Sequence, residues 1–300
     1  MIMEKCLVTK IKGAVTNNDL EKFGMLSFKV NTNVSESENN SYYRILNSVN
    51  PTKAKIGSGD ILFYNTFAAT SGTSEVTLPT TNYTRFIKGN SGTFDIENKY
   101  NMTALEVSSR FNLIGGLETL KSVSGLEKIL LHTTGDIANL QGNIATLSSL
   151  TLYNKDTNNK VYGTVSLTSA SNLTSLTFTN TDVSVNIAEL ASNTALTSIR
   201  IPNTKCYGNI TTGLGNNTSL TRMEILGSNV SGDLKEFVLA QIAAGRSTCD
   251  RIDCPAISYC PNITTGSATI RETRSGGWLS WTSSDSIIYH SGDGTTTWTL

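Results

Sequence analysis

One hydrophobic pattern recurs about six times between residues 102 and 239. Each copy places an apolar residue, two mostly polar residues, a second apolar residue, one variable residue and a third apolar residue. Four clear copies begin at Leu147, Leu173, Leu196 and Leu220, and two looser copies begin at Met102 and Leu126. A unit this short cannot bury its apolar side chains alone. The copies are therefore predicted to stack on one another and build a solenoid.

Each copy also shows its local structure. The last three positions alternate apolar, variable and apolar, which is the period of a strand with one buried face. A second apolar pair follows downstream, as at Val230 and Leu234, and the small polar residues Gly232 and Asp233 between them suit a tight bend. The pattern therefore predicts a strand, a turn and a returning segment in every unit.

The spelling L-x-x-L-x-L followed by x-G-x-I/L resembles the leucine-rich repeat, in the variant common in plant receptor ectodomains. The resemblance covers residues 102–239 and implies a fold rather than a function. The family places an Asn three residues after L-x-L, where its side chain bonds backbone groups inside the coil. This chain has Thr181, Thr204 and Ser228 there, and their hydroxyls are expected to do a weaker version of that work.

The flanking segments predict two further β modules. Residues 1–97 contain short alternating strands, and Gly92–Ile96 is expected to lead into the solenoid and cap it. Asp233 and Glu236 have the spacing of a capping box and open a predicted helix that Gly245 ends. The fold class is therefore mainly β, a leucine-rich-repeat solenoid between two small β modules. Three domains are predicted. Residues 1–97 form an N-terminal β module for attachment or oligomerisation, residues 98–248 form the repeats with a capping helix, and residues 249–300 form a C-terminal β module.

Composition narrows the function. Lys and Arg together number 24, as do Asp and Glu, so there is no basic excess to predict nucleic-acid binding. The apolar stretches are too short to span a bilayer, and residues 1–6 lack the apolar region of a signal peptide. We therefore predict no membrane insertion and no secretory export. The many Thr, Ser, Asn and Gly residues favour a β-rich protein with a polar surface.

Candidate chemistry is sparse. The two histidines, His132 and His290, fall in different modules, and His132 is expected to be a plain surface residue. No phosphate-binding loop or nucleophile elbow occurs, so the chain is predicted not to be an enzyme. The spacing Cys249, Cys254, Cys260 lacks the CxxC of common zinc sites. A zinc site, a disulfide and reduced thiols all stay open there, with reduced thiols favoured; no metal or cofactor is predicted.

The remaining candidates are binding surfaces. In a solenoid the variable strand positions point outward on one continuous sheet face. This face is predicted to bind polar or glycan partners through Lys128, His132, Tyr153, Thr179, Arg200, Arg222 and Glu224, beside Glu106, Ser108, Thr151 and Thr177. Trp278, Trp281 and Trp298 form a second candidate near the C-terminus. These rings either grip a sugar or partner protein, or form the core of the C-terminal module and its seal against the repeats. Gly292, Asp293 and Gly294 predict a hairpin among them.

Residues 6–24 resemble the N-termini of structural proteins of crAss-like phages of Bacteroides-type gut bacteria. The resemblance implies a virion component whose N-terminal module docks on the particle or on its own copies, while the remainder varies. The predicted function is thus a tail- or head-associated, fibre-like adhesion protein of the virion, assembled in the host cytoplasm, that binds a host surface glycan or protein. The chain departs from familiar fibres in having no long shaft. The alternative is a leucine-rich-repeat binding protein of the Bacteroides-type cell surface, which would normally carry an export signal.

Overall fold

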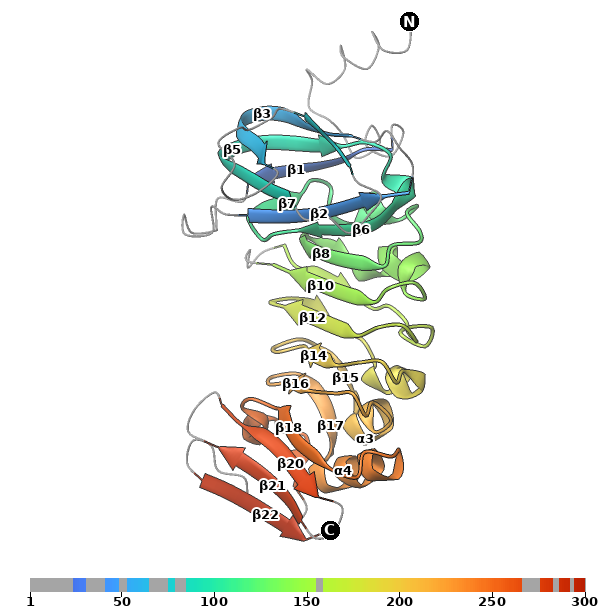
Figure 1. The fold of residues 1–300 in the computed structure, drawn as a ribbon, viewed down its shortest axis with the longest axis vertical. Helices are drawn as coiled ribbons and strands as arrows, with labels where there is room; N and C mark the ends of the chain where they lie inside the picture. Colours follow the sequence, from blue (N-terminus) through green and yellow to red (C-terminus); the bar gives the residue numbers. More distant parts are fainter. Residues whose placement is uncertain are drawn as a thin grey trace, which may run out of the picture.

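A computed structural model describes most of the chain. The described residues are 24–30, 41–48, 53–64, 75–78, 85–154, 159–265, 276–282, 286–291 and 294–299. Across these residues the protein is mainly β, as predicted, and a 16-stranded mixed sheet runs from one end of the molecule to the other. Figure 1 shows this sheet as an elongated stack, with helical turns along one side of its middle part.

The N-terminal part is antiparallel. Its elements are β1 (Leu26–Val30), β2 (Ser41–Asn47), β3 (Lys53–Tyr64), β4 (Glu75–Thr77) and β5 (Arg85–Ile96), followed by the turn η2 (Lys99–Asn101) and, after β6, by β7 (Phe111–Leu113). Aromatic packing forms its core: the rings of Phe28 and Phe94 stack with centroids 4.9 Å apart, and Phe63 and Phe111 meet Phe94 edge-on. Residues 1–23 of the predicted N-terminal module lie outside the described residues.

The predicted cap at Gly92–Ile96 is wrong. These residues end β5, which pairs with β1, β2 and β3 rather than with the first repeat. The first repeat strand is instead covered by β2, which pairs antiparallel with it from Tyr43 opposite Val107 to Asn47 opposite Met102. The pairing joins segments more than fifty residues apart in the sequence, and the sheet therefore crosses the predicted boundary at residue 97 without a break.

The repeats supply the parallel part of the sheet. Its strands are β6 (Met102–Val107), β8 (Lys128–His132), β10 (Ser149–Tyr153), β12 (Ser175–Thr179), β14 (Ser198–Arg200), β16 (Arg222–Glu224) and β18 (Cys249–Asp253). The first three lie in the two looser copies and the first clear copy, and β18 continues the series beyond the last predicted repeat. Each predicted copy thus supplies one strand to a common ladder.

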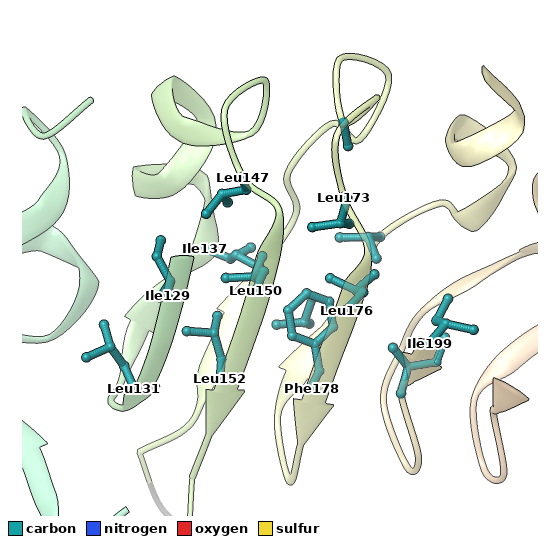
Figure 2. Packing of buried hydrophobic residues seen from close by; sticks show 14 of the residues in the cluster. Ile129, Leu131, Ile137, Leu147, Leu150, Leu152, Leu173, Leu176, Phe178 and Ile199 are labelled. Atoms are coloured by element: carbon teal, nitrogen blue, oxygen red, sulfur yellow. The ribbon is translucent and has the colours of Figure 1, made fainter. Parts of the chain in front are cut away.

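The ladder is in register, as predicted. Leu150 lies opposite Leu176, Leu176 opposite Ile199 and Ile199 opposite Met223, and all four side chains are fully buried. A parallel apolar layer contains Phe178, Ile201 and Ile225. Figure 2 shows how Ile129, Leu150, Leu176 and Ile199 follow one another from strand to strand. Equivalent positions of successive copies therefore form continuous apolar rows.

The returning halves of the units carry short strands and helical turns. The side strands are β9 (Gly135–Asp136), β11 (Val161–Gly163), β13 (Asp182–Val183), β15 (Tyr207–Asn209), β17 (Asn229–Asp233) and β19 (Ile263–Thr264). The helical elements are η3 (Gly116–Leu120), η4 (Ile137–Asn143), η5 (Ile187–Ser192), α3 (Ile210–Leu214) and α4 (Leu234–Ala243). The small polar residues at the predicted bends are the N-caps: the Oδ1 atom of Asn209 accepts hydrogen bonds from the N–H groups of Thr211 and Thr212. Gly208, at φ 108°, makes the turn before it.

The predicted capping helix is α4. Oδ1 of its N-cap, Asp233, accepts from the N–H groups of Lys235 and Glu236, and Gly245 follows the helix end at φ 102°. Gln241 on α4 is fully buried, and its Nε2 donates to the carbonyl oxygens of Leu214 and Gly215 at the end of α3. The helix thus packs against α3 of the preceding unit, but it does not end the ladder as predicted, because β18 and β19 continue the parallel pairing after it.

At two of the three positions where the sequence predicted a bonding hydroxyl, the hydroxyl bonds the backbone inside the unit. Thr204 Oγ1 donates to the Ile201 carbonyl at 2.9 Å, and Ser228 Oγ donates to the Ile225 carbonyl at 2.6 Å. Thr181 is also fully buried, but its Oγ1 has no hydrogen-bond partner among the described residues. The main polar network inside the coils lies elsewhere, on buried asparagines that precede the strands: Asn143, Asn193 and Asn217.

The C-terminal part extends the same sheet. After β18 and the turn η6 (Ile257–Tyr259), the strands β20 (Trp278–Thr282), β21 (Ser286–Ser291) and β22 (Gly294–Thr299) continue it antiparallel. The strands β21 and β22 confirm the predicted hairpin, whose turn at residues 292–293 lies outside the described part. Trp281 Nε1 donates to the Arg246 carbonyl at 3.1 Å, so this part is held against the end of the repeats.

Candidate functional site

The outward side chains of the parallel strands fall into three rows. The first row runs Lys128, Ser149, Ser175, Ser198 and Arg222; the second runs Leu130, Thr151, Thr177, Arg200 and Glu224; the third runs His132, Tyr153 and Thr179. Because equivalent positions align, the ladder brings together residues that the sequence separates by more than twenty positions. All seven predicted binding residues of this face lie on these rows.

Exposure along the rows is uneven. Thr179 is exposed, and Lys128, Tyr153, Arg200 and Arg222 are half-buried. Thr151 and Thr177 are buried, although the prediction placed them at the surface. They are neighbours in the second row, and the larger Leu130 and Arg200 lie on either side of the pair. A ligand on this face would therefore meet Thr179 and the long side chains rather than Thr151 or Thr177.

Three charged residues form one cluster on β14 and β16. Glu224 Oε2 accepts a hydrogen bond from Arg200 Nε and another from Arg222 Nη2, both at 2.9 Å. Burial raises the pKa of Glu224, but the bonds from Arg222 and Arg200 outweigh that effect and hold its pKa below its ordinary value. The carboxylate is therefore ionised at neutral pH, and the cluster carries one net positive charge.

The ion pairs of this cluster orient the guanidinium N–H donors and contribute little to the stability of the fold. Partly exposed ion pairs contribute about 1 kcal/mol or less each. Arg200 uses only its Nε in the contact, and a guanidinium has five N–H donors, so its Nη groups remain for a ligand. Tyr153 stands close by: burial raises the pKa of its phenol, and the charge of Arg200 lowers it by a smaller amount. We call Tyr153, Arg200, Arg222 and Glu224 the strand-face cluster.

His132 is not the surface residue that the sequence predicted. Its side chain is only 3% exposed. The ring lies at the end of β8 between Asn112 of β7 and Tyr153 of β10, which are its register partners on either side. The prediction failed because β7 follows β6 as a second, separate strand that joins β8 there, and the repeat pattern does not show it.

Trp278 and Trp281 pack against neighbouring residues and do not form an open binding surface. Trp281 is 2% exposed and makes the bond to Arg246 described above. Trp278 is half-buried; its ring stacks on His290 at 4.6 Å, while the guanidinium of Arg251 lies 4.7 Å from its centroid. Since β18 and β21 flank β20 on opposite sides, both faces of the Trp278 ring are covered. Trp298 is described only as a backbone position of β22, opposite Ile287.

Two exposed tyrosines on the side strands were missed by the sequence analysis. Tyr162 on β11 is 51% exposed and Tyr207 on β15 is 46% exposed, both on the side strands. Each directly precedes a glycine with positive φ, Gly163 and Gly208, and that shared Tyr-Gly pair was a signal that could have located them. Lys205 is exposed on the same side and pairs loosely with Asp182 at 3.9 Å.

The cysteines show no site chemistry in the described part of the chain. Cys206, Cys249, Cys254 and Cys260 are buried and not joined by disulfides, while Cys6 lies outside it. Burial raises the pKa of the Cys206 and Cys249 thiols. Within the ranges described, no three His, Cys, Asp or Glu side chains come close enough to share a metal ion.

Comparison with protein-family models and with curated proteins gave no match. Among the described helices, none is both long and apolar enough to cross a bilayer. The function must therefore be argued from the strand face itself.

Proposed function

We propose that this protein is a non-enzymatic adhesion protein whose repeats form a leucine-rich-repeat solenoid and whose strand face binds a polar surface glycan. The observation that carries the proposal is the strand-face cluster. Three separate strands place Tyr153, Arg200, Arg222 and Glu224 on one face. Glu224 holds both arginines in place, and each guanidinium has further N–H groups that bond to none of the described residues. Such preset donors suit the hydroxyls and ring oxygens of a polysaccharide.

An extended ligand fits this arrangement better than a small one. The rows continue over several strands, and neighbouring strands lie about 4.8 Å apart, so a chain laid across them meets similar groups at regular intervals. Each contact is weak because it is partly exposed to water. Weak contacts become useful when many act together on one polymer, or when several copies of the protein act together.

The proposed location is a virion, with the N-terminal segment as the attachment to the particle. This part of the proposal rests on the resemblance of residues 6–24 to phage structural proteins. Those residues precede β1 in the sequence, which begins at Leu26, so the segment can be removed without cutting any described strand. The proposed partners are other virion proteins or further copies of this chain.

Binding to polysaccharides tests the role of the strand face. The full chain is applied to an array of neutral and acidic bacterial polysaccharides, alongside a Tyr153→Ser, Arg200→Gln variant. We expect the variant to lose about tenfold in affinity or more, because it removes an aromatic contact and a charged donor, each a contribution of about 1 kcal/mol.

A matched control is available on the side strands. Tyr162→Ser with Lys205→Gln also removes one tyrosine and one positive charge, from exposed positions away from the face. Binding should be unchanged in this control, and thermal unfolding should be similar for all three proteins. Equal loss in both variants, or no binding by the unaltered chain, would contradict a strand-face site.

Removing residues 1–23 tests the attachment. The truncated chain keeps every described strand, so it should still unfold cooperatively and bind the same polysaccharides. In particles assembled in infected host cells, mass spectrometry should detect the full chain but not the truncated one. Incorporation of the truncated chain would remove the basis for the proposed docking role.

A further inference from the structure

A partly open cavity of about 260 Å³ lies where the N-terminal strands meet the repeats. Its walls include Lys29 of β1, Asn112 of β7 and His132 of β8, together with Thr133, Thr134 and Asn154 from the loops that follow β8 and β10. The cavity thus lies at the junction of two parts of the fold, a common position for ligand sites. None of its residues belongs to the strand-face cluster.

The cavity nevertheless continues one row of the strand face. Lys29 lies opposite Asn112, Asn112 opposite His132, and His132 opposite Tyr153. The third row therefore runs from the cavity directly to the cluster residue Tyr153. A polymer lying along this row would bring one of its residues to the cavity mouth.

The charge and polarity of the residues that line the cavity indicate which class of ligand it would bind. Among the described residues that form it there is one ammonium group, that of the exposed Lys29, and no acidic side chain. The remaining polar groups are amides, hydroxyls and the imidazole of His132, which suit a ligand rich in hydroxyls. Asn112 Oδ1 is buried and accepts no hydrogen bond from the described residues, so the lining includes an acceptor whose bonding capacity is unused.

We propose that this cavity binds an acidic sugar residue of the polysaccharide, with the carboxylate at Lys29 and the hydroxyls at Asn112 and the threonines. This inference rests on the proposed function, which it deepens by naming the ligand class and the subsite. The size agrees: a cavity of about 260 Å³ is many times larger than the space that one water molecule needs and has room for one sugar ring. A neutral sugar would fill the same space but leave Lys29 without a counter-charge.

Nuclear magnetic resonance on the labelled full chain tests the assignment. The probes are methyl glucuronoside, methyl glucoside and acetate, which separate an acidic sugar from a neutral sugar and from a simple anion. We expect the glucuronoside to shift the side-chain amide signals of Asn112 and Asn154 and to bind roughly fivefold more tightly than the glucoside, the effect of one partly exposed charge pair. Acetate should leave these signals unmoved.

Two variants complete the test. Lys29→Gln should make the affinities for the two sugars equal, whereas Lys121→Gln, which removes an exposed ammonium outside the cavity, should keep the fivefold preference. Equal binding of both sugars by the unaltered chain, or no shift at Asn112 and Asn154, overturns the cavity site. If polysaccharide binding then still depends on Tyr153 and Arg200, the proposed function stands. If the glucuronoside is preferred through Lys29 but polysaccharide binding does not depend on Tyr153 and Arg200, the strand-face site is overturned instead.

Discussion

Replacing Ile199 with Asp should unfold the repeats under conditions in which the unaltered chain is folded. Ile199 is fully buried on β14, with Leu176 and Met223 as its register partners in the apolar row. A carboxylate there would be surrounded by aliphatic side chains and have no partner. The cost is several kcal/mol, against a total stability of about 5–15 kcal/mol for a typical domain. Far-ultraviolet circular dichroism during heating should show a large loss of stability or no cooperative transition.

The control places the same charge one strand away. Thr179→Asp introduces an aspartate at an exposed position at the end of β12, where water can solvate it. Its effect should be within about 0.5 kcal/mol, as for ordinary surface substitutions. If Ile199→Asp melts at the same temperature as Thr179→Asp, the observed register of the apolar rows is wrong.

The register of the parallel strands could be predicted because the local sequence of every copy determines it. Alternation over three positions identifies the buried side of each strand, and the recurrence of Leu176, Ile199 and Met223 aligns the strands with one another. The helix that begins at Leu234 could also be predicted, because its N-cap Asp233 and its end near Gly245 are marked by local sequence signals. Such features need no knowledge of distant parts of the chain.

The cap and the burial of His132 could not be predicted because they depend on distant pairings. β2 covers β6 although a long segment containing β3, β4 and β5 separates them. His132 is enclosed by Asn112, twenty residues earlier, on a strand whose apolar, polar, apolar pattern is only three residues long and therefore too short to identify it in the sequence. The spacing of the repeats predicted that the strand-face residues lie on one surface. It could not predict the hydrogen bonds that join Arg200, Arg222 and Glu224, because these depend on how the side chains of neighbouring strands are oriented.

Replacing Asn193 with Ala should cost about 3 kcal/mol of unfolding free energy, a large effect for a single polar side chain. Asn193 is almost fully buried, and its amide bridges two successive coils. Nδ2 donates to the carbonyl oxygens of Ala170 and Leu173, while Oδ1 accepts from the N–H groups of Ala195 and Leu196 at 2.9 and 2.8 Å. Alanine would leave three buried backbone groups and the partly buried N–H of Ala195 without this partner, and each buried unsatisfied group costs about 1–3 kcal/mol before water or relaxation restores part of it.

The next coil gives a matched control. Asn216 also donates a bond to the preceding coil, from its Nδ2 to the Ala191 carbonyl at 3.2 Å, but its side chain is exposed. Asn216→Ala therefore removes the same amide where water can replace it, and should change stability by less than about 0.5 kcal/mol. Urea unfolding should show a lower midpoint for Asn193→Ala at an unchanged slope, since the surface exposed on unfolding stays the same. Coincident midpoints for the two variants would mean that the buried amide does not join the coils. Because the bonds of Asn193 run from one unit to the preceding one, a large difference would show that polar groups as well as apolar rows hold neighbouring repeats together.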